Sequence, residues 1–133
     1  MSATAAELSG IPLFDSLSES EREQLAKWFD VETAGEGVRL TGEGASGYSF
    51  FVLLDGSAAV TSAGAEIATL LPGDFFGEMA ILGDGRRSAT VTTTSPSRVL
   101  TLFGTEFRQL QQAHPQIAER IEAATRERAT NRG

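Results

Sequence analysis

The spacing of apolar residues changes twice along the chain and divides it into three parts. Residues 1–31 carry apolar positions at helical intervals after a capping-box pair, Ser18 and Glu21, so they are predicted to form N-terminal helices. Residues 35–103 switch to short runs of β-branched and aromatic residues separated by turn formers, a pattern that predicts strands. From residue 105 to 130 the helical interval returns, so C-terminal helices are expected.

Six runs in the middle part are predicted strands. They are Val38–Thr41, Tyr48–Leu54, Ala58–Thr61, Ile67–Leu71, Ala89–Thr94 and Arg98–Phe103. Many short strands at nearly regular intervals, with turn signals such as Asp55-Gly56 between them, are typical of an antiparallel barrel or jelly roll. The predicted fold class is therefore α+β, mainly β: a small antiparallel β-barrel (jelly roll) flanked by N-terminal and C-terminal helices, in a single domain over residues 1–133.

The apolar residues of the two helical parts predict which faces are buried. In the N-terminal part, Leu25, Trp28 and Phe29 recur at helical spacing. In the C-terminal part the predicted core positions are Phe107, Leu110 and Ala113, then Ile117, Ala118, Ile121 and Ala124. The break between them is His114-Pro115, because proline is tolerated at the first position of a helix, where its missing N–H costs nothing. As the lone imidazole, His114 is expected to cap a helix or face solvent rather than bind a metal.

Composition and charge narrow the function classes. The chain has 133 residues and a formal net charge of −7, which argues against a nucleic-acid partner, since duplex binding requires a basic surface. It has no cysteine, so disulfides, thiol nucleophiles and thiolate metal sites are excluded. No apolar run approaches the roughly 20 residues that span a bilayer, and no secretory signal is visible. We therefore expect a cytoplasmic protein. The carboxylates Asp15, Glu19, Glu21, Glu23 and Glu32 are interpreted as a solvated face.

One glycine motif has the wrong surroundings for a dinucleotide site. Gly42–Gly47 matches G-x-G-x-x-G, but a dinucleotide fingerprint must open a helix whose N-terminus faces the pyrophosphate. The predicted strand Tyr48–Leu54 follows the motif instead. We therefore interpret the motif as a glycine-rich corner between strands.

The segment from Gly73 to Val91 has the features of an anion site. Phe76-Gly77-Glu78 leaves a strand, Met79–Leu82 is long enough for one helical turn, and Arg86-Arg87 follows a glycine-rich turn. The free N–H groups of a helical turn, an adjacent glycine and a cation together favour a bound anion. A carboxylate would repel a bare phosphate, but it accepts hydrogen bonds from hydroxyl groups. The segment therefore predicts a receptor for a sugar phosphate.

Residues 76–91 resemble the phosphate-binding cassette of the cyclic nucleotide-binding domain family, which includes catabolite activators, kinase regulatory subunits and channels. The family pattern is close to F-G-E-[LM]-A-[LI], a short turn, then R-[AST]-A-[TS]-V, and Phe76–Val91 matches it. A second family signature, glycines around an aromatic-aliphatic strand, lies at Gly44–Gly56. The resemblance spans roughly residues 10–128 and implies a fold that binds a cyclic nucleotide.

The resemblance also implies a role for each residue of the cassette. Glu78 would accept a hydrogen bond from the ribose 2′-hydroxyl, and Arg87 would bind the exocyclic oxygens of the cyclic phosphate. Backbone N–H groups would share the phosphate charge, and Arg86 is expected at the surface. The ligand-binding residues that the resemblance implies are Phe76, Gly77, Glu78, Met79, Ala80, Arg87, Ser88 and Ala89, with Val91 as a support. It implies neither catalytic nor metal-binding residues.

The serine after Arg87 bears on ligand choice. Within the family, threonine at this place can contact the guanine amino group and alanine favours adenine, so Ser88 is intermediate. We expect cAMP as the ligand, with cGMP bound more weakly, and no separate cofactor. Ile121, Ala124 and Arg128 are candidates to cap the base from the last helix.

The predicted function is a regulatory cyclic nucleotide-binding module, not an enzyme, that converts ligand binding into movement of the C-terminal helices. Two alternatives stay open at this point. A degenerate barrel would bind no nucleotide and act as a protein-interaction module, although Glu78 and Arg87 are both intact. A cupin-like metalloenzyme would need several inward-facing histidines, and the chain has one.

Overall fold

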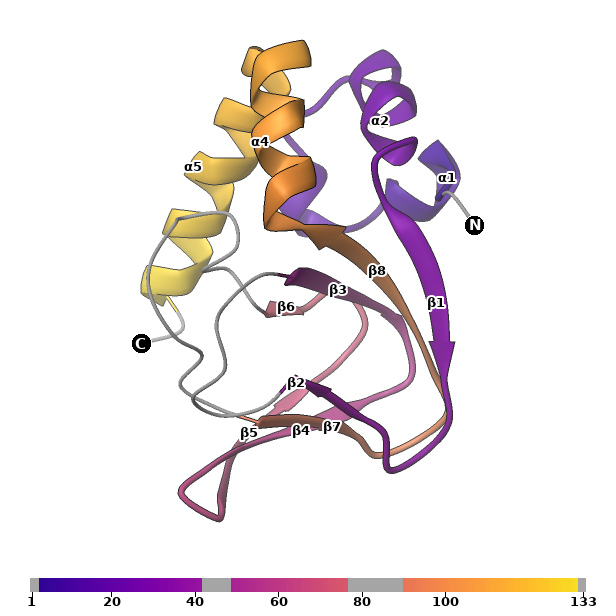
Figure 1. Ribbon diagram of the computed structural model, residues 1–133, viewed down its shortest axis with the longest axis vertical. Helices are drawn as coiled ribbons and strands as arrows, with labels where there is room; N and C mark the ends of the chain where they lie inside the picture. The colour runs from indigo at the N-terminus through magenta and orange to yellow at the C-terminus, as the bar shows by residue number, and fades with distance from the viewer. Residues whose placement is uncertain (1–2, 42–48, 77–89, 132–133) are drawn as a thin grey trace.

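The computed structural model describes residues 3–41, 49–76 and 90–131 and arranges them in three layers (Figure 1). Helices form the layer at the top of Figure 1, and two β-sheets lie below them. The helices are α1 (Ala5–Leu8), the 3-10 helix η1 (Pro12–Phe14), α2 (Glu19–Ala26), α4 (Gly104–Ala113) and α5 (Pro115–Asn131). The strands are β1 (Asp30–Ala34), β2 (Arg39–Thr41), β3 (Ser49–Asp55), β4 (Ala58–Ser62), β5 (Ala65–Leu70), β6 (Phe75–Phe76), β7 (Thr90–Thr93) and β8 (Ser97–Phe103).

The described strands pair into two antiparallel sheets. The first sheet, next to the helices, has the order β1-β8-β3-β6, and the second has the order β2-β7-β4-β5. The prediction of a mainly β jelly roll flanked by helices is confirmed, and the described strands form two separate sheets that do not close into one barrel. Successive strands such as β1 and β2 lie in different sheets, so the chain crosses between layers and each sheet buries one face against the other.

The N-terminal helical region ends earlier than the sequence predicts. The expected capping box forms at the start of α2, but α2 stops at Ala26, so Trp28 and Phe29 lie beyond it. Residues 30 and 31 belong to β1, which pairs with β8. Buried and exposed residues do not alternate along β1. Its conformation is therefore decided by backbone pairing with β8 rather than by a pattern visible in the sequence.

The larger of two cores lies between the helices and the first sheet. The strands send alternate side chains into it, among them Phe50, Phe75 and Leu100. The helices contribute Leu8, Leu13, Phe14, Leu25, Phe107, Leu110, Ile117, Ala118 and Ile121. Ala113, which was predicted on the buried face, is exposed because α4 ends there. Each large apolar side chain buried here contributes about 1.5–3 kcal/mol, so this core holds the helices on the sheet.

The second core lies between the two sheets. It consists of Phe51, Leu53, Ala58, Leu70, Phe76, Val91 and Val99. In β3, Phe50 faces the helices and Phe51 faces the second sheet; in β6, Phe75 and Phe76 divide in the same way. This alternation makes β3 and β6 the shared wall of both cores.

The two C-terminal helices are separated at the predicted position. His114 is the C-cap of α4 and Pro115 is the first residue of α5. The capping role predicted for His114 is therefore confirmed. Its half-buried ring also lies edge-on to Trp28, with the ring centroids 6.5 Å apart. The sequence does not predict this contact, which joins the helix break to the segment after α2.

Thr93 fixes the turn that leads from β1 to β2. Its buried hydroxyl donates to the Gly35 carbonyl at 2.6 Å and accepts from the Val38 N–H at 2.8 Å. Thr93→Val keeps the shape and removes both bonds, so we expect the free energy of unfolding in urea to fall by about 1–3 kcal/mol. Thr92→Val, on the opposite face of β7, is the control and should change it by less than about 0.5 kcal/mol. Equal losses in the two variants would contradict this role of Thr93.

Candidate functional site

The first and last residues of the predicted cassette, Phe76 and Val91, both lie in the core between the sheets. At the N-terminal end, Phe76 lies in β6 of the first sheet and is 5% exposed. At the C-terminal end, Val91 lies in β7 of the second sheet and is 3% exposed. Residues 77–89 therefore join one sheet to the other, and the two strands that flank them are fixed by the same apolar cluster.

Phe76 is held by a stacked aromatic pair. Its ring lies on Phe51 of β3 with centroids 4.9 Å apart and planes 15° apart, and the two residues are directly paired in the antiparallel register. Such a pair contributes about 0.5–1.5 kcal/mol beyond the burial of its area. The sequence predicts a strand around Phe51 but does not predict which face it presents, so this partner of Phe76 was missed.

The structure describes part of the predicted site. Phe76 and Val91 both lie in the core between the sheets, and their roles toward a ligand stay predictions. The remaining predicted ligand-binding residues lie outside the described residues: Gly77, Glu78, Met79, Ala80, Arg87, Ser88 and Ala89. Their roles stay predictions.

The glycine motif falls between strands, as the sequence predicts. β2 ends at Thr41 in the second sheet, and β3 begins at Ser49 in the first. A strand therefore follows the motif, where a dinucleotide fingerprint would need a helix. Gly42–Gly47 themselves lie outside the described residues.

Of the three residues of α5 that were predicted as candidates to cap the base, two are packed in or against the helix-sheet core. Ile121 is 1% exposed in the core between the helices and the first sheet, and Ala124 is packed against that core. Both side chains are thus used in helix packing. The backbone of α5 continues through residue 128, whose side chain lies outside the described part of the chain. At 3.6 residues per turn, position 128 lies within about 20° of Ile121 around the helix axis.

An ion-pair network ties the first sheet to the N-terminal helix. Arg98 in β8 donates to Asp55 at 2.6 Å and to Glu7 of α1 at 3.1 Å. The hydrogen bond and charge of Asp55, with a smaller contribution from Glu7, raise the pKa of Arg98. Because the Arg98 side chain is 44% exposed, solvent screens these pairs. They link α1 to β8 and add little stability.

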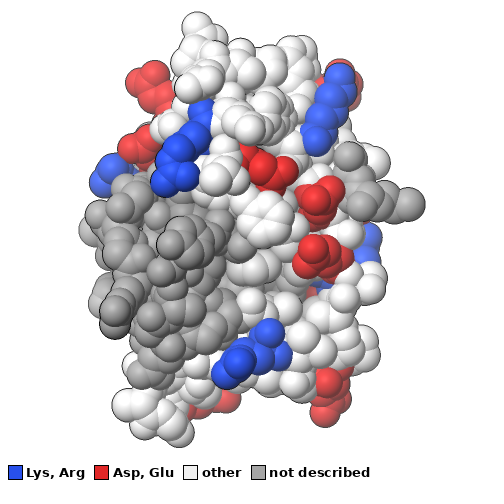
Figure 2. Space-filling view, in the orientation of Figure 1, with Lys and Arg blue, Asp and Glu red and all other residues white. Residues whose placement is uncertain are grey.

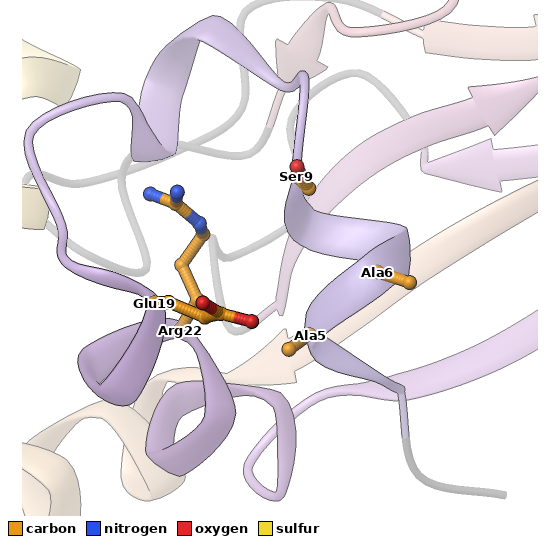
Figure 3. A pocket seen from close by; sticks show the side chains of 5 residues that line it. All are labelled: Ala5, Ala6, Ser9, Glu19 and Arg22. Carbon is orange, nitrogen blue, oxygen red and sulfur yellow. The ribbon is translucent and has the colours of Figure 1, made fainter.

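An open hollow lies between α1 and α2 (Figure 3). It encloses about 490 Å³ and is lined by Ala5, Ala6, Ser9, Glu19 and Arg22. The Arg22 guanidinium is turned toward the backbone carbonyls of Phe14 and Leu17, to which it donates. Its charge is therefore already engaged by the protein, and we assign no ligand to this hollow.

Charged side chains are dispersed over the face shown in Figure 2. Among the described residues on this face, Lys and Arg stand apart and are interspersed with Asp and Glu, without merging into one basic surface. Among residues 3–41, 49–76 and 90–131, no group of three His, Asp or Glu side chains is placed to hold a metal ion. No helix in this part of the chain combines the length and apolar character needed to cross a membrane.

Comparison with known sequences covers the segment that the structure leaves undescribed. A model of the family described as "Cyclic nucleotide-binding domain" matches residues 32–114, which is more than half of the chain and includes the cassette. The cAMP-dependent protein kinase regulatory subunit of Hypocrea atroviridis is 34% identical over 103 residues, covering 77% of this chain and 22% of that protein. This chain therefore spans about a fifth of the length of that relative.

Solved structures share the fold. A cyclic nucleotide-binding domain from Methylobacillus flagellatus superimposes with a TM-score of 0.84 at 23% identity, covering 96% of this chain and 75% of that one. The regulatory domain of Toxoplasma gondii PKA, crystallised with cAMP, gives a TM-score of 0.78 at 23% identity, covering 96% and 48%. Because the family model matches most of the sheet region and the known folds agree with the one described here, this chain belongs to the cyclic nucleotide-binding domain family.

Proposed function

We propose that this chain is a regulatory module that binds a cyclic nucleotide, cAMP in preference to cGMP, and has no catalytic activity of its own. The observation that carries the proposal is the cassette sequence inside the family match. It places a carboxylate, Glu78, and a guanidinium, Arg87, in one segment whose flanking strands are fixed in the core between the sheets.

The two charged residues suit the two halves of a cyclic nucleotide. Arg87 offers a planar fork of N–H donors to the exocyclic phosphate oxygens, a geometry that lysine does not provide. Glu78 repels phosphate but accepts a hydrogen bond from the ribose 2′-hydroxyl. The backbone N–H groups from Gly77 to Ala80, and that of Ser88 or Ala89, add donors for the phosphate. A ligand with both a phosphate and a free ribose hydroxyl satisfies the whole set.

The aromatic pair at the start of the cassette supports this assignment. The stacking of Phe76 on Phe51 fixes the last strand residue before Gly77. A site that binds an anion through backbone N–H groups depends on such preorganisation, because donors that must be ordered on binding weaken the complex. Phe76 therefore acts in this proposal as a buried anchor for the donors, and not as a direct contact for the phosphate.

The base preference rests on one position. Alanine after the arginine favours adenine in this family, and threonine there can contact the guanine amino group. Ser88 carries the hydroxyl without the extra methyl group. We therefore propose cAMP as the preferred ligand and cGMP as a weaker one.

The response to ligand is assigned to α5. The helix break at His114-Pro115 lets α5 change direction without unwinding α4, since Pro115 has no N–H to continue the ladder. Position 128 is the remaining candidate to cap the base, since Ile121 and Ala124 pack in or against the core between the helices and the first sheet. Movement of α5 would pass the signal to a further domain or a partner protein.

Thermal unfolding with added nucleotide tests the proposed function. Ligand at about 100 times its dissociation constant stabilises a protein by about 2.7 kcal/mol, so saturating cAMP should raise the Tm by several degrees. 5′-AMP, which has an open phosphate, is the control and should give a much smaller rise. If no cyclic nucleotide raises the Tm, the chain is a non-binding interaction module. Tenfold tighter binding of cGMP than of cAMP, about 1.4 kcal/mol, would overturn the base preference.

A further inference from the structure

The direction of α5 depends on side-chain contacts. α4 ends at Ala113, and the backbone of His114 (φ −140°, ψ 69°) is not helical. Because Pro115 then starts a new helix without donating a hydrogen bond, the helical ladder does not carry the orientation of α4 into α5. Apolar contacts from Ile117, Ala118 and Ile121 bury one face of α5, but such contacts are non-directional. Packing of such side chains limits the crossing angle of a helix only to within about 15–20°, so a directional contact adds a sharper constraint on the angle.

One ion pair provides this directional contact. Arg120 of α5 donates to both carboxylate oxygens of Glu21 in α2, each at 2.5 Å. Glu21 is itself fixed, because it is the third residue of α2 and accepts from the Ser18 N–H at 2.9 Å in the capping box. The Ser18 hydrogen bond, and then Arg120, lower the pKa of Glu21 against the opposing effect of burial. The carboxylate is thus a charged, positioned acceptor rather than part of a solvated face.

A second contact joins the same two regions at the helix break. Trp28, two residues after the end of α2, lies edge-on to His114. The pairs Glu21–Arg120 and Trp28–His114 therefore connect the α2 region to α5 and to the residue that precedes it. Trp28 is the only tryptophan of the chain, so its fluorescence reports on this contact without added labels.

We propose that the Glu21–Arg120 ion pair is a positioning contact that holds α5 in the arrangement to which the cyclic nucleotide binds. This inference rests on the proposed function. The apparent dissociation constant of a ligand equals its intrinsic value divided by the fraction of protein in the competent arrangement. Loss of the pair lowers that fraction and weakens binding, although neither residue touches the ligand. By linkage, bound nucleotide strengthens the pair to the same extent.

The test is calorimetric titration of the intact chain with cAMP. Arg120→Gln removes one partner, and Glu21→Gln removes the charge of the other while glutamine can still complete the capping box. The pair is partly exposed, so solvent screens it and its contribution is small. We therefore expect each variant to bind cAMP about two- to fivefold more weakly. The double variant should bind no more weakly than either single variant, and Arg120→Lys should keep most of the affinity.

Arg108→Gln is the matched control. Arg108 is an exposed arginine of α4, and its substitution changes the net charge in the same way. It should leave the affinity unchanged, and it should also leave the emission of Trp28 in the free protein unchanged. Arg120→Gln should shift that emission, because displacement of α5 disturbs the Trp28–His114 contact.

The outcomes separate this inference from the proposed function. If the wild type binds cAMP and the Glu21 and Arg120 variants bind it equally well, the positioning role is wrong and the proposed function stands. Additive losses in the double variant would also contradict the positioning role, because they would mean that the two side chains act independently. If the wild type does not bind cAMP, the proposed function is wrong and the positioning role falls with it.

Discussion

Replacing Arg87 with glutamine is expected to weaken cAMP binding by a factor of about 10 to 150. Hydrogen bonds to a charged group contribute about 1.5–3 kcal/mol, which corresponds to that range of affinity. Glutamine keeps a polar side chain of moderate length but loses the charge and the planar fork that fits a phosphate. Calorimetric titration of both proteins with cAMP measures the difference.

The adjacent arginine provides the control for this substitution. Arg86→Gln makes the same change in charge one position away, and Arg86 is expected at the surface. Its affinity for cAMP should stay within about twofold of the wild type. Unchanged binding in Arg87→Gln, or an equal loss in Arg86→Gln, would show that the phosphate is not held by Arg87.

Among glycine-to-alanine substitutions at the turn glycines that the structure describes, Gly56→Ala is expected to cause the largest loss of stability. Gly56 has φ +94°, and a Cβ added there would lie 2.2 Å from the Ser97 Oγ, 2.6 Å from the Pro96 carbonyl oxygen and 2.8 Å from the Ser97 Cα. Strain in the left-handed region costs about 1–2 kcal/mol, and overpacking costs about 1–3 kcal/mol. The free energy of unfolding should therefore fall by about 2–5 kcal/mol, measured by urea unfolding with Trp28 fluorescence.

Gly64 separates the two causes of this loss. Its φ is +81°, but no atom lies within 4 Å of an added Cβ. Gly64→Ala should thus show the backbone strain alone, at about 1–2 kcal/mol. If Gly56→Ala is no more destabilising than Gly64→Ala, the contact with the 96–97 turn does not constrain the fold as described.

Local signals in the sequence predict those parts of the fold that depend on neighbouring residues. The capping box of Ser18 and Glu21 marks the start of α2, and His114-Pro115 marks the break between α4 and α5. Each signal works because one or two side chains satisfy the backbone groups beside them. The apolar run of β3 predicts a strand, and its neighbours Phe50 and Phe51 are directed to opposite faces, as successive residues of any strand are.

Features set by distant contacts could not be predicted in the same way. β1 exists because Asp30–Ala34 pairs with β8, almost 70 residues later in the chain. Glu21 looks like one of several solvated carboxylates until α5 brings Arg120 to it. The division of the strands into two sheets depends on which strands become neighbours, and strand spacing alone does not determine this.

The candidate site was likewise predicted only in part from the sequence. The order of Glu78, Arg87 and the glycines between them predicts the ligand class, because it specifies chemical groups and their separation. What the sequence does not predict is the anchoring of the cassette: the stacking of Phe76 on Phe51, and the burial of Val91 in the same core from the opposite sheet.

A crystal structure of this chain with cAMP tests the central claim most directly. We expect the Arg87 guanidinium to lie about 2.7–2.9 Å from the exocyclic phosphate oxygens, and the Glu78 carboxylate to accept the ribose 2′-hydroxyl. A complex in which cAMP binds elsewhere, or in which both side chains are directed into solvent, would contradict the proposed function.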